Sequence, residues 1–141
     1  MRQIEAGVFI GGQITAADIV ELATTGVRTI VNNRPDDEEP GQPSSATLER
    51  AALDADIAYT YVPIAGGFSP EAVAAARAAM LAGAAPVLLF CKSGMRSAAL
   101  WALARATEGA ESEALITAAA EAGYDLRAFR PMLLRQAGSN P

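Results

Sequence analysis

The chain has 141 residues, of which 51% are hydrophobic, and a formal net charge of -5. A chain of this length buries one hydrophobic core, so we expect a single domain over residues 1–141. The absence of histidine excludes Ser-His-Asp and Cys-His catalysis and the common zinc sites, and 11 lysines and arginines in an acidic chain disfavour a broad nucleic-acid surface. We therefore expect no metal, no cofactor and no nucleic-acid partner.

The chain also lacks the features of a membrane or secreted protein. No stretch approaches the roughly 18 uninterrupted apolar residues that a membrane helix needs. The start, MRQIEAGVFIGG, has no apolar segment of the kind that a secretory signal contains. The single cysteine, Cys91, cannot form an internal disulfide, which fits a reducing compartment. We expect a cytoplasmic protein that does not bind membranes.

Short apolar segments rich in β-branched residues alternate with segments of helical periodicity. We expect strands at residues 7–12, 27–32, 58–64 and 86–90. We expect helices at residues 15–26, 45–56, 69–84, 97–109, 112–124 and 125–137. An acidic segment rich in proline and glycine, residues 33–45, is expected to be a loop, and the last residues, 138–141, are expected to fray.

Individual residues predict where some of these helices begin or break. Thr15 and Asp18 have the spacing of a capping box at the start of the first helix. Ser69 is a good N-cap, and Pro70 then occupies the first helical position. Pro131 predicts that the last helix is kinked or interrupted.

Strands that are separated by helices cannot pair as hairpins, so the strands at 27–32, 58–64 and 86–90 should be parallel. The fold class is therefore α/β: a helix-covered, mainly parallel β-sheet with a helical C-terminal part. Ligands of such sheets bind beyond the carboxyl ends of the strands. We expect the loops that follow these strands to converge on one crevice: 33–43, 65–68 and 91–96.

The third of these loops, CKSGMRS, has the composition of an anion-binding loop. Gly94 permits a turn that other residues resist, and Ser97 is expected to open a helix whose positive end faces the loop. Arg96 adds a cation with fork geometry, and such surroundings favour a reactive thiolate. We interpret Cys91 as the nucleophile rather than as a buried structural thiol. Substrate contacts are expected from the backbone of the loop: Lys92, Ser93, Gly94, Met95 and Ser97.

This loop resembles those of the Cys-Arg phosphatases and of the rhodanese sulfurtransferases. Four motifs in order, GGQI, NNRPDDEEPGQP, YVPI and FCKSGMRSAALWALA, resemble the phosphatase-like domain family of β-lactamase-hydrolase-like proteins over most of residues 7–107. The resemblance implies a fold like that of the protein tyrosine and dual-specificity phosphatases. It also implies a role in sulfide detoxification, with a functional link to a sulfur dioxygenase or another sulfide oxidation enzyme, since some members are fused to such a domain.

The sequence departs from the phosphatase pattern in three places. Phe90 stands where phosphatases have a histidine, four residues rather than five separate Cys91 from Arg96, and the segment VPIAGGF has no carboxylate to act as general acid. A loop of the form C-x-x-G-x-R resembles that of single-domain rhodaneses. We therefore favour a sulfurtransferase that forms a Cys91 persulfide from thiosulfate or a low-molecular-weight persulfide, a reaction that needs no protonated carboxyl.

The alternative is a phosphomonoester hydrolase, like the tyrosine and dual-specificity phosphatases, with a phosphocysteine intermediate. In that case a carboxyl of the acidic loop could protonate the leaving group: Asp36, Asp37, Glu38 or Glu39. Arg34 would orient this loop or bind an anion. A non-catalytic anion-binding or redox-sensing module is a third reading. The expected partner is a small anionic sulfur donor or a phosphorylated substrate.

Overall fold

The structure is a computed structural model that describes residues 1–138, so the fraying expected for 138–141 lies almost entirely outside the described residues. One five-stranded sheet has the strand order β1-β2-β5-β3-β4. Only the pair β1 and β2 is antiparallel, and the other neighbouring pairs are parallel. The strands are β1 (Arg2–Glu5), β2 (Val8–Gly11), β3 (Thr29–Asn32), β4 (Ala58–Tyr61) and β5 (Val87–Phe90). The expected mainly parallel α/β sheet is confirmed.

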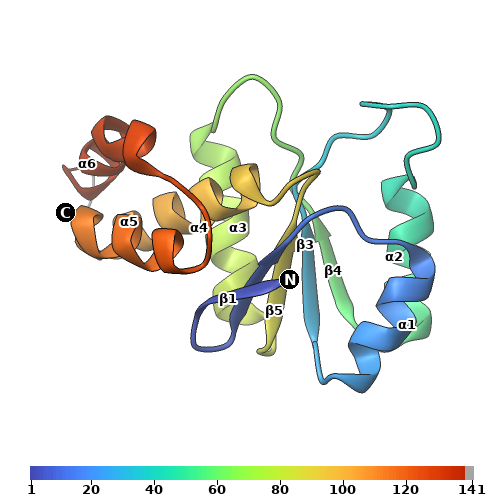
Figure 1. The fold of residues 1–141 in the computed structure, drawn as a ribbon. Coiled ribbons are helices and arrows are strands. Elements are labelled where there is room, and N and C mark those ends of the chain that lie inside the picture. Colours follow the sequence, from blue (N-terminus) through green and yellow to red (C-terminus); the bar gives the residue numbers. More distant parts are fainter. Residues whose placement is uncertain (139–141) are drawn as a thin grey trace.

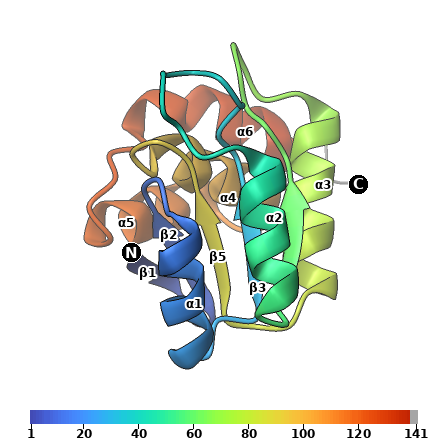
Figure 2. The same ribbon diagram turned by 90° about the vertical axis from the view of Figure 1, so that its right-hand side faces the viewer.

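Helices cover both faces of this sheet. The helices are α1 (Ala16–Thr24), α2 (Ser45–Asp54), α3 (Pro70–Ala82), α4 (Met95–Thr107), α5 (Ser112–Glu121) and α6 (Arg130–Gly138), with a 3-10 turn at Arg127–Phe129. Two of them, α1 and α2, lie on one face, and α3 to α6 lie on the other (Figure 1). Figure 2, viewed from the α1 and α2 side, shows α4 and α6 behind the sheet. None of these helices is long and apolar enough to cross a membrane.

Each face of the sheet buries its own hydrophobic cluster, because successive strand residues point to opposite sides. Leu88 and Phe90 of β5 pack with α1 and α2, whereas Val87 and Leu89 join the larger cluster under α3 to α6. Helix α4 is buried almost all round because it lies between the sheet and helices α3, α5 and α6. The helix that follows the cysteine loop is therefore the central element of the larger core.

Several predicted helix ends are confirmed. The capping box at α1 is present: the Thr15 side chain accepts from the Asp18 backbone, and the Asp18 carboxylate accepts from the Thr15 backbone at 2.8 Å. Ser69 caps α3, with Pro70 as its first residue. The helix expected at 125–137 is interrupted, as Pro131 predicts: a 3-10 turn at Arg127–Phe129 is followed by α6, which begins only at Arg130 and has Pro131 in its first turn.

Two expectations from the sequence are wrong. The expected first strand is paired with an additional strand, β1, which the sequence does not reveal because three of its four residues are polar and only Ile4 is buried. Gly7, at φ +77°, forms the turn between them. Helix α4 begins at Met95 rather than at Ser97, because Gly94 serves as its N-cap in a left-handed conformation.

Candidate active site

The cysteine loop leaves the sheet between two other strand ends. Strand β5 lies between β2 and β3, so Cys91 emerges at the centre of the edge where the parallel strands end (Figure 1, top). The segment after β2 packs directly on the loop. The backbone N–H of Cys91 donates to the carbonyl of Gly11 at 3.3 Å, and the backbone N–H of Gln13 donates to the carbonyl of Lys92 at 3.2 Å. A Cβ atom on Gly12 would lie 3.0 Å from the Lys92 carbonyl oxygen, so a larger residue there would push the two segments apart by a few tenths of an ångström.

The loop wraps around the sulfur of Cys91. The backbone N–H of Gly94 donates to Cys91 Sγ at 3.1 Å, and α4 starts at the next residue, so the positive end of the helix lies beside the sulfur. Gly94 has φ +101°, and a Cβ atom there would lie 2.5 Å from the hydroxyl oxygen of Tyr124. Both the backbone conformation and the packing therefore require glycine. The Cys91 side chain is fully buried in this state.

Ser97 joins the loop to the end of β3. Its hydroxyl donates to Asn33 Oδ1 at 2.7 Å, in a buried hydrogen bond, and Asn33 Nδ2 donates to the carbonyl of Val62 at 3.0 Å. The Ser97 side chain is thus used to hold α4, β3 and the end of β4 together, whereas its expected contact with substrate is through the backbone. Its hydroxyl contributes by fixing the position of the loop.

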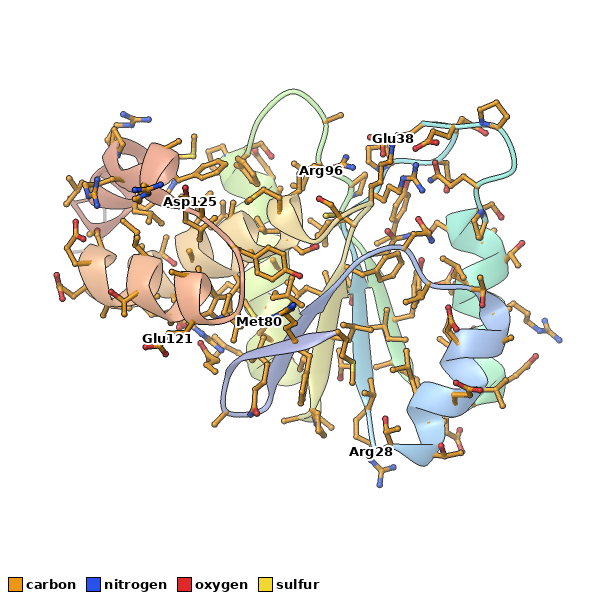
Figure 3. The ribbon with its side chains drawn as sticks, viewed as in Figure 1. Arg28, Glu38, Met80, Arg96, Glu121 and Asp125 are labelled. Atoms are coloured by element: carbon orange, nitrogen blue, oxygen red, sulfur yellow. The ribbon has the colours of Figure 1, made fainter. Side chains whose placement is uncertain are left out.

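Arg96 contacts the two other loops at the same time. Its Nη1 donates to Glu38 Oε2 at 2.7 Å and to the carbonyl of Ile64 at 2.9 Å, and its Nη2 donates to Glu38 Oε1 at 2.9 Å. Figure 3 shows Arg96 and Glu38 next to each other at the edge of the sheet. The pKa of Arg96 is raised, chiefly by the hydrogen bond to Glu38 and further by the nearby Cys91. The Nε–H and the second Nη2–H form the edge of the guanidinium that neither Glu38 nor Ile64 takes.

Two carboxylates of the acidic loop lie between three cations. Arg34 is 5% exposed, and it donates through Nε to Glu38 and through Nη2 to Glu39, both at 2.9 Å. Lys92 forms an ion pair with Glu39. The hydrogen bond from Arg96 is the main reason that the pKa of Glu38 falls to about 2, and the one from Lys92 lowers the pKa of Glu39. Neither carboxyl is protonated at neutral pH in this arrangement.

An open pocket of about 360 Å³ lies over these charges and is lined by Glu38, Glu39, Lys92 and Arg96. Its walls come from the acidic loop and the cysteine loop, so the predicted convergence of these two loops is confirmed. Residues 65–68, the remaining predicted loop, do not line this pocket. The residue before them, Ile64, contacts the site through its carbonyl, which accepts from Arg96. The side chain of Phe68 packs instead against Phe129, with ring centroids 5.8 Å apart.

Other predicted residues lie away from the pocket. Asp36 Oδ1 accepts the backbone N–H of Ser45 at 2.7 Å, at the start of α2. Asp37 is exposed and adopts φ 62°, which places it at a turn of the loop. Ser93 is exposed, and its hydroxyl accepts the Met95 N–H at 3.4 Å, while Met95 packs against the larger core.

Three residues at the site were not identified as functional from the sequence. Gln13 Oε1 accepts from Arg34 Nη1 at 3.0 Å, and Asn33 holds Ser97. Tyr124, beyond α5, lies against Gly94; burial raises the pKa of its hydroxyl, and the charge of Cys91 raises it further. Gln13 and Asn33 belong to two of the quoted motifs, but no local pattern pointed to Tyr124.

Comparison with known proteins identifies a family. Residues 1–108 match the family model described as the phosphatase-like domain of beta-lactamase hydrolase-like protein. The chain is 37% identical over 134 residues to a beta-lactamase hydrolase-like protein of Xylella fastidiosa, covering 94% of this chain and 31% of the relative. It is 34% identical over 141 residues to one of Agrobacterium fabrum, covering 99% of this chain and 33% of the relative. The chain thus spans about a third of these relatives.

Solved structures show the same fold. A candidate phosphatase from Neisseria meningitidis superposes with a TM-score of 0.84 at 31% identity, covering 96% of both chains. The structure of Tk-PTP in the active form has a TM-score of 0.70 at 17% identity, covering 99% of this chain and 97% of that one. Kinase associated phosphatase has a TM-score of 0.70 at 14% identity, covering 95% and 88%. The expected tyrosine and dual-specificity phosphatase fold is confirmed.

Proposed function

Because this chain belongs to the family of the phosphatase-like domain of beta-lactamase hydrolase-like proteins, we propose that it hydrolyses phosphomonoesters through a covalent intermediate on Cys91. The spacing of the cysteine loop alone favours a sulfurtransferase over a phosphatase. We place the phosphatase first because the family and the fold neighbours carry phosphatase descriptions. In kinase associated phosphatase the catalytic site includes a cysteine, which was replaced by serine in the solved structure. The proposed substrates are phosphomonoesters as a class.

The observation that carries this proposal is the arrangement around the sulfur. The Gly94 backbone N–H donates to Cys91 Sγ, helix α4 begins at the next residue, and the Arg96 guanidinium lies close enough for Cys91 to raise its pKa. Donors arranged in this way favour negative charge both on sulfur and on the oxygens of a transferred phosphoryl group. Since their positions are already fixed in the folded chain, they need little reorganisation during the reaction.

In the first step, the Cys91 thiolate attacks phosphorus; the S–P bond forms and the P–O bond to the leaving group breaks. In the second step, water attacks phosphorus, the S–P bond breaks, and inorganic phosphate and the thiolate are released. Arg96 holds the phosphoryl oxygens in both steps, and the Gly94 N–H stabilises the sulfur as a thiolate before attack and after release. Glu38 keeps Arg96 in place and remains ionised.

Protonation of the leaving group is the step for which this site is poorly equipped. Glu38 and Glu39 line the pocket, but their lowered pKa values keep them ionised. Water then protonates the departing oxygen, which is easy for a phenolate and difficult for an alkoxide. The proposal therefore includes a preference for aryl phosphates over alkyl phosphates.

Substrate must also reach a buried sulfur. Cys91 is fully buried, and the acidic loop is tied to the cysteine loop by the pairs Glu38–Arg96 and Glu39–Lys92. Both pairs are partly exposed, and exposed ion pairs are individually weak. The Glu39–Lys92 pair is the more exposed of the two, so its opening by an incoming anion would give access to the sulfur while Glu38 stays on Arg96.

The test is turnover of p-nitrophenyl phosphate with acid-quenched intact mass spectrometry. We expect turnover that vanadate inhibits, and a phosphoryl adduct on wild-type protein. Cys91→Ser should abolish both, whereas Arg50→Met, at an exposed pair with Asp54 on α2, should leave both unchanged. Turnover that persists in Cys91→Ser would contradict the proposal.

A sulfurtransferase is the second candidate, and it is favoured by the spacing of four residues between Cys91 and Arg96 and by the two ionised carboxylates. The thiolate would attack the outer sulfur of thiosulfate, forming a new S–S bond as the original one breaks and sulfite leaves. No acid is required. Thiosulfate or glutathione persulfide should then add one sulfur to the wild type and none to Cys91→Ala, and no adduct with either donor would rule this candidate out.

A further inference from the structure

We propose that Arg34 is a positioning residue for Arg96, acting through the Glu38 carboxylate. This deepens the proposed function and rests on it, because it assigns a role in anion binding to a residue that does not line the pocket. The chain of contacts runs from Gln13 through Arg34 and Glu38 to Arg96. It joins the segment after β2, the acidic loop and the cysteine loop.

Arg34 is fixed on every side. It is 5% exposed, and its backbone N–H donates to Asn32 Oδ1 at 2.9 Å. Each of its three guanidinium nitrogens donates to a different acceptor, namely Gln13, Glu38 and Glu39. A planar fork that uses all its nitrogens leaves its partners little freedom. Arg34 is therefore a rigid base from which the two carboxylates project.

Glu38 is the movable partner in this chain. Its side chain is 29% exposed and lies on a loop, so the carboxylate would sample several rotamers if nothing held it. Glu38 Oε1 accepts from both Arg34 Nε and Arg96 Nη2, and Oε2 accepts from Arg96 Nη1. Arg34 thus fixes the oxygen that also receives Arg96. The position of one guanidinium is transmitted to the other through a single carboxylate.

The result for Arg96 is a defined orientation. Glu38 takes the Nη1 and Nη2 end of the guanidinium, and the carbonyl of Ile64 takes a further Nη1 donor. The edge formed by Nε–H and the second Nη2–H is then left for an anion held at Cys91, which lies close enough to contribute to the raised pKa of Arg96. Without Glu38 in place, rotation of this side chain would turn the edge away from the anion. A misplacement on the order of 1 Å costs about 10²-fold in rate for a positioned group.

The competing explanation is that Arg34 only anchors the acidic loop. Both explanations predict a loss of thermal stability when Arg34 is replaced. They differ in anion selectivity at the sulfur, because a loop anchor affects access to Cys91 for every reagent equally. Positioning of Arg96 affects only reagents that carry a negative charge.

The experiment compares alkylation of Cys91 by iodoacetate, an anion, and by iodoacetamide, which is neutral and of similar size. The ratio of the two rates cancels access and thiolate reactivity. We expect Arg34→Met to lower this ratio about tenfold, close to the effect of Arg96→Met, and Arg34→Lys to restore part of it. Glu38→Gln, at a partly exposed position where the loss of stability should leave the chain folded, should lower it by a similar factor. Arg50→Met is the charge-matched control and should leave it unchanged.

An unchanged ratio in both Arg34→Met and Glu38→Gln, with a lowered ratio in Arg96→Met, would overturn the inference. If Arg96→Met also left the ratio unchanged, Arg96 would not bind the anion, and the inference and the proposed function would both fail. A ratio that falls as expected in a protein that hydrolyses no phosphate ester would contradict the proposed function alone. The double variant Arg34→Met/Glu38→Gln should show no additional loss, since both residues act in one chain.

Discussion

Two neighbouring loops at the same edge of the sheet differ sharply in chemistry. The loop after β3, residues 33–44, carries four carboxylates and is fixed by ion pairs to Arg34, Lys92 and Arg96. The loop after β4, residues 62–69, has no carboxylate, and a Cβ atom on Gly66 or Gly67 would meet nothing within 4 Å. Backbone groups hold it at the site: the Ile64 carbonyl accepts from Arg96, and the Ile64 N–H donates to the carbonyl of Asn33 at 2.9 Å.

This difference separates two tasks that a carboxylate can perform at an anion site. A carboxylate held by cations has a lowered pKa and orients the cation, as Glu38 does for Arg96. A carboxylate that serves as general acid needs a pKa near the working pH, and therefore an environment without such partners. The loop after β3 has the ion-paired carboxylates that can orient a cation. The loop after β4 has no carboxylate, so it cannot supply a general acid.

Arg96 contacts both loops, so its removal should have the largest effect. We expect Arg96→Met to lower kcat/KM for p-nitrophenyl phosphate by about 10²–10³-fold, because a preorganised donor to the phosphoryl oxygens is lost. Arg96→Lys keeps the charge but cannot bind Glu38, Ile64 and an anion together, so it should recover little. Steady-state kinetics with Arg50→Met as control measure this. A loss below about threefold in Arg96→Met would contradict the role given to Arg96.

Placing a carboxylate on the second loop should supply the missing acid. Ala65 is exposed and directly follows Ile64, so Ala65→Asp introduces a carboxyl next to the site, where the nearby Arg96 is already paired with Glu38. We expect turnover of an alkyl phosphate to rise about tenfold relative to an aryl phosphate, at the low end of the usual effect of a general acid. Ala65→Asn is the matched control. Equal gains in both variants would show that loop mobility, and not proton donation, is responsible.

The pH dependence of stability should distinguish the first loop from the second. The pKa of Glu38 falls from 4.5 to about 2 in the folded chain, so its stabilising contribution is present above pH 4.5 and is lost as the pH falls toward 2. The difference in Tm between wild type and Glu38→Gln should therefore be constant at neutral pH and shrink over this range. Thermal denaturation followed by circular dichroism measures it. Ala65→Asn on the second loop should show no such convergence.

The smallest effects are expected where the two loops are alike. Each ends in a serine that caps the next helix: Ser44 accepts from the Thr47 N–H at 3.2 Å, and Ser69 accepts from the Ala72 N–H at 3.1 Å. Ser44→Ala and Ser69→Ala should each lower the free energy of unfolding by about 1 kcal/mol, the typical value of an N-cap. Chemical denaturation measures both. A much larger loss for Ser44→Ala would indicate that the charged loop depends on its cap.

Much of this fold follows from local patterns in the sequence. The capping residues Thr15 and Ser69, the strands that end at Asn32 and Phe90, and the glycine in the cysteine loop are all predictable, because each depends on residues that are close in the chain. Strand β1 was missed because its polar residues carry no periodic pattern. The start of α4 was placed two residues late because Gly94 caps it without a side-chain hydrogen bond.

The sequence by itself determined which residues are available for catalysis and anion binding. These are one cysteine, an arginine at a fixed spacing from it, a glycine between them, and a set of carboxylates in a chain without histidine. Only the tertiary structure decided how they are used. Glu38 and Arg96 are 58 positions apart in the chain, and Arg34 and Gln13 are 21 apart. Which carboxylate binds which cation depends on where the parallel strands end in space, and no local pattern encodes that. Burial, set by the same packing, then determines which of these groups are held rigid and which remain free to move.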